Sequence, residues 1–159
     1  MGDSITPKII KYTIPGRPVT KKNSQRMVKN PKTGRWFPVP SDQYKKYEKE
    51  SKEYLHPKPI KPIDIPVNIQ CVYFIPLNKD GTIPKNAPDL LNLLEATCDI
   101  LVKYKIIMDD NVSIVRSHNG SEVIWIDYGN LPLTYIEIST KFPKVFTFSE
   151  KDFEAKDAG

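Results

Sequence analysis

The 159-residue sequence contains few of the residues that build disulfide frameworks and zinc centres. It has two cysteines, Cys71 and Cys98, and two histidines, His56 and His118. No CxxC pair is present, so a structural zinc site and a small disulfide-stapled fold are both poor fits. Both cysteines lie among apolar residues, which predicts reduced cysteines packed in a core.

Long apolar runs are also missing. No stretch approaches the ~18 consecutive apolar residues of a membrane span, and the first residues lack the apolar run of a secretory signal. We therefore expect a soluble, cytoplasmic protein with no membrane partner. The sequence has no glycine-rich phosphate loop and no spacing typical of a Ser-His-Asp triad, which leaves carboxylates as the candidates for chemistry.

The charge is unevenly distributed along the chain. The net charge is +5, but residues 1–59 hold 14 Lys and Arg against 5 Asp and Glu, whereas residues 60–159 hold 10 against 14. Residues 8–35 carry nine basic side chains and no acidic one. This distribution favours binding of a polyanion by the N-terminal part of the chain.

Hydrophobic patterning predicts alternating strands and helices. A first strand over 8–14 is followed by a basic hairpin with strands near 26–28 and 35–39, and by a helix that begins after Ser41 and ends near Leu55. Residues 67–75 form the clearest strand, and their continuous apolar end predicts burial on both faces. A helix from Asp89 to about Lys103 and strands near 112–117, 122–126 and 133–139 complete the pattern.

These elements predict an α+β fold in which a mixed β-sheet is covered by two helices within one domain. We expect residues 1–140 to form the domain. Residues 141–159 would form a C-terminal tail whose phenylalanines dock on the domain or a partner, with a mobile, charged end.

Two acidic clusters stand out from the remaining sequence. Asp89, Glu95 and Asp99 lie in the second predicted helix, and Asp109 and Asp110 precede Asn111 in a turn. Carboxylates brought together by a fold can bind Mg²⁺, which would support phosphodiester hydrolysis beside a basic surface. The alternative is purely structural, because an aspartate before an apolar-periodic run can cap a helix and an Asp-Asp-Asn segment favours a turn.

The sequence resembles RusA-type Holliday junction resolvases over about residues 8–140. The segment PDLLNLLEATCDIL at 88–101, followed by MDDN at 108–111, is similar to the D-x-D-N-L-x-K-x-x-x-D-x-L helix and D-D pair of that family. IPGRP at 14–18 and KKNS at 21–24 resemble its N-terminal motif, and the order of elements agrees.

The resemblance implies specific site residues. Asp89 matches the first metal-site aspartate, and Asp110 matches the catalytic aspartate of the D-D pair beside Asp109. The second aspartate of D-x-D is replaced by Leu91, and the family lysine is replaced by Glu95. Because positions 91 and 95 are neighbours on a helix, we hypothesise that Glu95 supplies the displaced carboxylate. Asn92 and Asp99 also match family positions.

From this resemblance we predict an RusA-like, Mg²⁺-dependent endodeoxyribonuclease, with Mn²⁺ as an alternative metal. Asp89, Asp110 and Glu95 would be catalytic and, with Asp109, would hold the metal. Lys85, Lys21 or Lys22 could replace the family lysine. Tyr12, Trp36 and Phe37 interleave the basic segment, which favours nucleic-acid contact. The predicted DNA-binding residues are Lys21, Lys22, Asn23, Arg26, Arg35 and Lys85.

The implied substrate is a four-way DNA junction, cut by a homodimer during DNA recombination and repair, in a phage or prophage setting. A two-fold symmetric dimer suits a substrate that needs two paired cuts. One alternative is a catalytically degenerate protein that binds branched DNA. Another is a basic RNA- or ribosome-associated accessory protein in which the acidic pairs are only caps and turns.

Overall fold

The computed structural model describes residues 8–21 and 26–140, and these residues form one mixed sheet, two helices and a separate hairpin. The predicted tail, residues 141–159, lies outside the described residues. Five strands form the sheet in the order β1-β7-β4-β5, with β6 also paired to β4. The sheet strands are β1 (Ile9–Pro15), β4 (Val67–Pro76), β5 (Val115–Ser117), β6 (Glu122–Ile126) and β7 (Leu133–Thr140).

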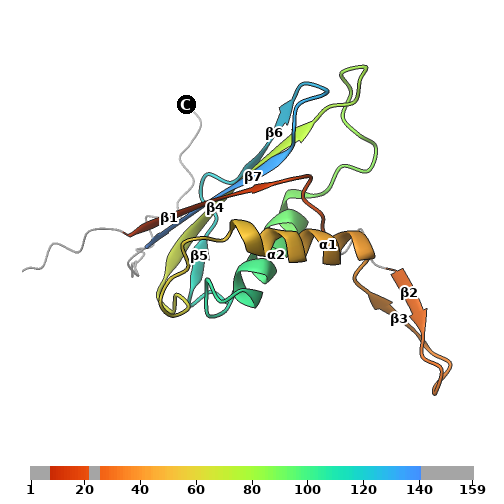
Figure 1. Ribbon diagram of the computed structural model, residues 1–159, viewed down its shortest axis with the longest axis horizontal. Coiled ribbons are helices and arrows are strands. Elements are labelled where there is room, and N and C mark those ends of the chain that lie inside the picture. Colours follow the sequence, from red (N-terminus) through yellow and green to blue (C-terminus); the bar gives the residue numbers. More distant parts are fainter. Residues whose placement is uncertain (1–7, 22–25, 141–159) are drawn as a thin grey trace, which may run out of the picture.

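The centre of the sheet is β4, which pairs with three other strands. It runs antiparallel to β7 along its length, and parallel to β5 and then β6 along its other edge. Ile69, Cys71, Tyr73 and Ile75 are buried on one face. On the other face Val72 is buried but Phe74 is only half-buried, so the predicted burial on both faces is incomplete, because both helices lie on the same side of the sheet (Figure 1).

Each helix begins where its sequence indicates. Helix α1 (Asp42–Ser51) starts after Ser41, whose hydroxyl accepts a hydrogen bond from the Tyr44 backbone N–H at 3.0 Å, and continues into the short 3₁₀ helix η2 (Lys52–Tyr54). Helix α2 (Leu90–Lys103) packs its apolar stripe against the sheet, with Leu94, Cys98 and Leu101 buried. The α+β prediction of a mixed sheet covered by two helices is therefore confirmed.

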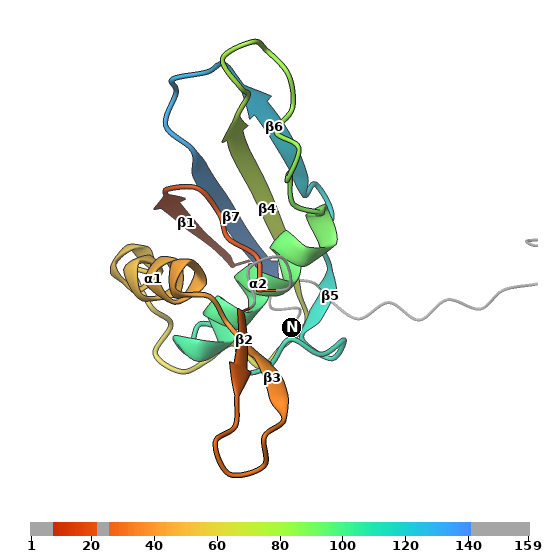
Figure 2. The same cartoon turned by 90° about the vertical axis from the view of Figure 1, so that its right-hand side faces the viewer.

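The basic hairpin stands apart from this core. Strands β2 (Arg26–Lys29) and β3 (Trp36–Val39) pair only with each other, and Figures 1 and 2 show the hairpin extending away from the helices and the sheet. Strand β5 is shorter than the predicted 112–117 strand, because Ile114 and Val115 donate backbone hydrogen bonds to the Asn111 carbonyl in a turn. No helix in the described ranges is long and apolar enough to cross a membrane.

Candidate acidic site

The Asp109-Asp110-Asn111 turn is held at both ends by buried residues. Before it, Ile106 and Ile107 are buried, and Ile63 forms a parallel bridge with Ile107. After it, the buried Ile114 leads into β5, and the Ile114 carbonyl accepts a hydrogen bond from the Val67 N–H of β4 at 2.7 Å. An exposed turn anchored in this way has a defined position relative to α2 and the sheet.

The two aspartates of this turn have different surroundings. The Asp109 carboxylate accepts hydrogen bonds from the Asp110 backbone N–H at 2.7 Å and from the Asn111 side-chain amide at 2.8 Å. These bonds hold the pKa of Asp109 below its usual range, as the turn interpretation predicts. Asp109 therefore shapes the turn, whereas the pKa of Asp110 is set mainly by partial burial and by neighbouring carboxylates.

Asp110 lies in the electrostatic field of other carboxylates. Partial burial, the hydrogen bond with Asp109 and the negative charges of Asp99 and Asp109 raise its pKa. The buried Cys98 on α2 lies in the field of Asp110 as well as Asp99. Burial raises the pKa of its thiol first, and negative charges that include these two carboxylates raise it further. The turn and the middle of α2 thus place Asp110 within electrostatic range of Asp99.

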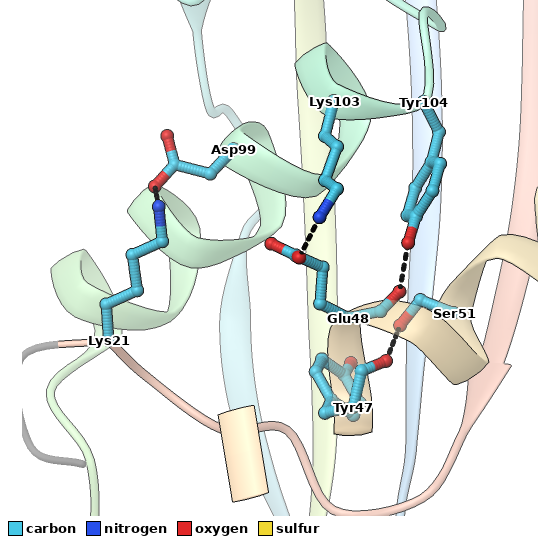
Figure 3. A network of polar contacts seen from close by, with 7 residues as sticks. All are labelled: Lys21, Tyr47, Glu48, Ser51, Asp99, Lys103 and Tyr104. Carbon is cyan, nitrogen blue, oxygen red and sulfur yellow. Dashed lines mark hydrogen bonds and ion pairs between the residues drawn. The ribbon is translucent and has the colours of Figure 1, made fainter. Parts of the chain in front are cut away.

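Lys21 brings a cation to this acidic pair. Its ammonium lies 3.0 Å from a carboxylate oxygen of Asp99 and 5.5 Å from the centre of the Tyr44 ring on α1 (Figure 3). The Lys21 and Asp99 side chains are 37% and 28% exposed, so water reaches the pair but does not surround it. Lys21 is held between the two helices, in contact with the acidic site. We refer to Asp99, Asp110 and Lys21 together as the acidic site.

The other predicted acidic residues lie at the start of α2. Asp89 occupies the N-cap position, but its side chain makes no capping bond and instead accepts a 3.4 Å hydrogen bond from the Asn92 amide. Glu95 is exposed one turn before Asp99, on the same side of the helix. Within residues 8–21 and 26–140, no three His, Cys, Asp or Glu side chains are close enough to form a metal-binding group.

The predicted set of Asp89, Glu95 and Asp110 therefore does not form such a group in the described structure, and its role stays a prediction. Two carboxylates are compatible with Mg²⁺, which is commonly held by one or two carboxylates together with water and substrate phosphate oxygens. Asp110 and Asp99 offer hard oxygen ligands, and their mutual repulsion is what a cation would relieve.

Further lysines line a hollow that shares Lys21 with the acidic site. A hollow of about 430 Å³ between the helices is lined by Lys21, Lys45, Lys49 and Lys103. Its wall is braced by an ion pair from Lys103 to the Glu48 carboxylate and by a 2.9 Å hydrogen bond from the Tyr104 hydroxyl to the Glu48 carbonyl (Figure 3).

The predicted DNA-binding residues are spread over three segments. Arg26 begins the hairpin and makes a 3.5 Å ion pair with Asp42, and Arg35 directly precedes β3. Lys85 is exposed on the loop before α2. Arg17 and the end of that loop, Asn86 and Pro88, line one hollow of about 200 Å³, which brings the N-terminal motif close to Asp89. Lys22 and Asn23 lie outside the described residues.

Several side chains prove structural. Tyr12, interpreted with Trp36 and Phe37 as an aromatic of the nucleic-acid surface, is 2% exposed and donates a 2.7 Å hydrogen bond to the Pro57 carbonyl, so that interpretation is wrong. Tyr44 and Tyr47 are buried and pack α1 against the rest of the domain. Cys71 and Cys98 are free, buried cysteines, and burial raises the pKa of Cys71 to about 12, which leaves its thiol inert.

The main residue that sequence reasoning undervalued is Asp99. Its family match was visible, but the spacing within α2 gave no reason to place it beside Asp110, because that proximity depends on how the 104–114 segment folds back. Of the lysines that line the 430 Å³ hollow, Lys21 was predicted, but Lys45, Lys49 and Lys103 were missed because they are scattered over the chain. The alternation of charge along α1 could have indicated Lys45 and Lys49.

Comparison with known proteins agrees with this architecture. The family model described as Endodeoxyribonuclease RusA matches residues 15–139 of the 159-residue chain, a range that includes both helices, the hairpin and the acidic site. No curated protein matches the chain. The range of the family match shows that the chain belongs to the RusA endodeoxyribonuclease family.

Proposed function

We propose that the protein is a divalent-metal-dependent endonuclease that cuts four-way DNA junctions at the acidic site. The observation that carries this proposal is the crowding of Asp110 by Asp99 and Asp109, with Lys21 bound to Asp99. A soluble protein gains no stability from placing like charges together on its surface. Such an arrangement is typical of a site that binds a cation and a phosphate.

We propose that Asp110 and Asp99 hold Mg²⁺ or Mn²⁺, with Asp89 contributing from the start of α2. The bound metal would stabilise charge on the phosphate and promote ionisation of a water molecule. Lys21 would neutralise part of the Asp99 charge and place its ammonium next to the incoming phosphate. In this role it replaces the family lysine, whose position is occupied by Glu95.

Glu95 is the second candidate for the displaced carboxylate, because it follows Leu91 by one helical turn. Changing Glu95 to Gln tests this role without changing side-chain size. If Glu95 reaches the metal when DNA is bound, cleavage by Glu95→Gln falls by about tenfold or more, because a metal ligand is lost. Cleavage of a mobile four-way junction at the unmodified rate would show that Glu95 has no such role.

DNA contacts are proposed for the hairpin arginines and for the lysines that line the 430 Å³ hollow. Contacts of this kind fix the phosphate backbone and its register but do not read bases. A homodimer with two-fold symmetry would present two acidic sites to the two strands cut in a junction. The expected setting is DNA recombination and repair, in a phage or prophage.

One observation favours a second candidate, a branched-DNA-binding protein without nuclease activity. Leu91 replaces a family aspartate and is 78% exposed on α2, where it cannot bind a metal. This candidate retains the DNA-binding surface but makes no metal-dependent product.

The proposed function is tested with four-way junctions labelled in each strand, incubated with Mg²⁺ or with EDTA and excess linear duplex as competitor. We expect paired cuts that require Mg²⁺. Excess linear duplex should not suppress this cleavage. Tight junction binding without cuts in Mg²⁺ or Mn²⁺ would favour the non-catalytic candidate. Equal affinity for RNA, linear duplex and junction at matched salt would contradict both.

A further inference from the structure

The hairpin β2–β3 presents an apolar face that the rest of the described chain leaves uncovered. Its register places Met27 opposite Pro38 and Lys29 opposite Trp36. Residues directly opposite each other in an antiparallel pair share a face, so these four side chains lie on one side of the hairpin. All four are exposed, with Trp36 at 62% and Met27 at 57%.

The opposite face of the hairpin is better covered. It carries Val28 and Val39, which are half-buried, and Phe37, which is 41% exposed. Arg26 on this face makes the ion pair with Asp42 at the base of the hairpin. The Trp36 face is therefore the more exposed of the two faces of the hairpin.

The tip of the hairpin is built to hold its shape. The Asn30 carboxamide oxygen accepts a 2.9 Å hydrogen bond from the Lys32 N–H, and the Asn30 N–H donates to the Arg35 carbonyl at 2.8 Å. Gly34, with φ of 71°, adopts the left-handed conformation that closes the turn. A surface that is ordered before binding loses less entropy when it meets a ligand.

The charge around this face selects nucleic acid as its occupant. The hairpin carries Arg26, Lys29, Lys32 and Arg35, and no acidic residue occurs between positions 26 and 41. Cations around an exposed tryptophan suit a ligand with phosphates and aromatic bases, because bases stack on aromatic side chains while phosphates bind the cations. Apolar side chains such as methionine and proline also insert between base steps.

We propose that Trp36 stacks on a base exposed at the branch point of the DNA, flanked by Met27 and Pro38. In linear duplex, every internal base is already covered by its neighbours, so stacking on Trp36 would first require two base pairs to unstack, which costs free energy. A branch point interrupts the stack and offers base faces at lower cost. The inference rests on the proposed function and assigns to Trp36 the preference for branched over linear DNA.

The first test measures affinity in EDTA, where no metal-dependent cutting occurs. Trp36→Ala is expected to weaken binding of a four-way junction by about 5- to 150-fold, the effect of losing one stacked base, and to change linear-duplex affinity by less than about 2-fold. Phe37→Ala is the matched control, because Phe37 is the adjacent aromatic on the other face; its loss of junction affinity is expected to be smaller. The salt dependence of junction affinity should be the same for Trp36→Ala and for the parent, since no charge is removed.

The second test uses tryptophan fluorescence, because Trp36 and Trp125 are the only tryptophans in the sequence. In Trp125→Phe the emission comes from Trp36 alone, and we expect the junction to quench it more strongly than linear duplex does at equal occupancy. Junction affinity equal to the parent in Trp36→Ala, an equal loss for duplex and junction, or unchanged Trp36 emission would each overturn the inference. A parent protein with no preference for junctions would instead refute the proposed function, and this inference with it.

Discussion

Replacing Asp110 by Asn is expected to lower the rate of junction cleavage in Mg²⁺ by about 100-fold or more. The carboxylate is the proposed metal ligand of the turn, and losing one preorganised electrostatic group in an active site commonly has effects of this size. DNA binding in EDTA should be retained or slightly strengthened, because one negative charge near the phosphate is removed. Single-turnover cleavage and a binding titration on the same junction measure both quantities.

The same variant should not be less stable than the parent. The folded-state pKa of Asp110 is raised, so above that pKa the folded protein holds the ionised form less favourably than the unfolded chain does, and ionised Asp110 is destabilising. Asn removes this effect, so the midpoint of thermal unfolding at pH 7 should stay equal or rise. Asp127→Asn, at an exposed position on the loop between β6 and β7, controls for net charge. Normal cleavage by Asp110→Asn would refute the site.

Replacing Lys21 by Met is expected to lower the cleavage rate at saturating Mg²⁺ by about 100-fold. Met keeps the apolar stem against Tyr44 but removes the ammonium that lies 3.0 Å from Asp99. The Mg²⁺ concentration that gives half-maximal rate should stay equal or fall, because a cation that competes for Asp99 is removed. Lys21→Arg should recover part of the rate.

The control for Lys21 is Lys11→Met. Lys11 is exposed on β1, between Ile10 and the buried Tyr12, on the side of the sheet away from the helices. If Lys11→Met lowers the cleavage rate as much as Lys21→Met does, Lys21 acts only through net charge. If a lower unfolding midpoint accounts for the slower cleavage by Lys21→Met, Lys21 acts only through stability.

Local sequence signals were sufficient for most of the fold. The β-branched run of β4, the apolar stripe of α2 and the Ser41 cap each specify an element through neighbouring residues. The parallel pairing of β5 and β6 along one edge of β4 was not predictable, because it depends on long-range packing. For the same reason, the burial of Tyr12 against Pro57 across 45 residues of chain had no local signal.

The acidic site was only partly predictable. The resemblance already pointed to Asp110 rather than Asp109, and the hydrogen bonds of the turn give the structural role of Asp109 that the sequence did not show. The grouping of Asp99 with Asp110 and Lys21 needs the 104–114 segment to fold back toward α2, and Lys21, which is distant in the chain, to reach Asp99. Sequence reasoning instead favoured Glu95, because helical spacing is the one proximity that a sequence displays directly.

The most direct test of the central claim, that the acidic site holds a metal on bound DNA, is a count of bound Mn²⁺ by electron paramagnetic resonance. Samples contain junction alone, junction with parent protein and junction with Asp110→Asn, at equal DNA occupancy. We predict that the parent complex binds more Mn²⁺ than the variant complex, by one ion per chain. Equal Mn²⁺ binding by the two complexes would contradict the claim.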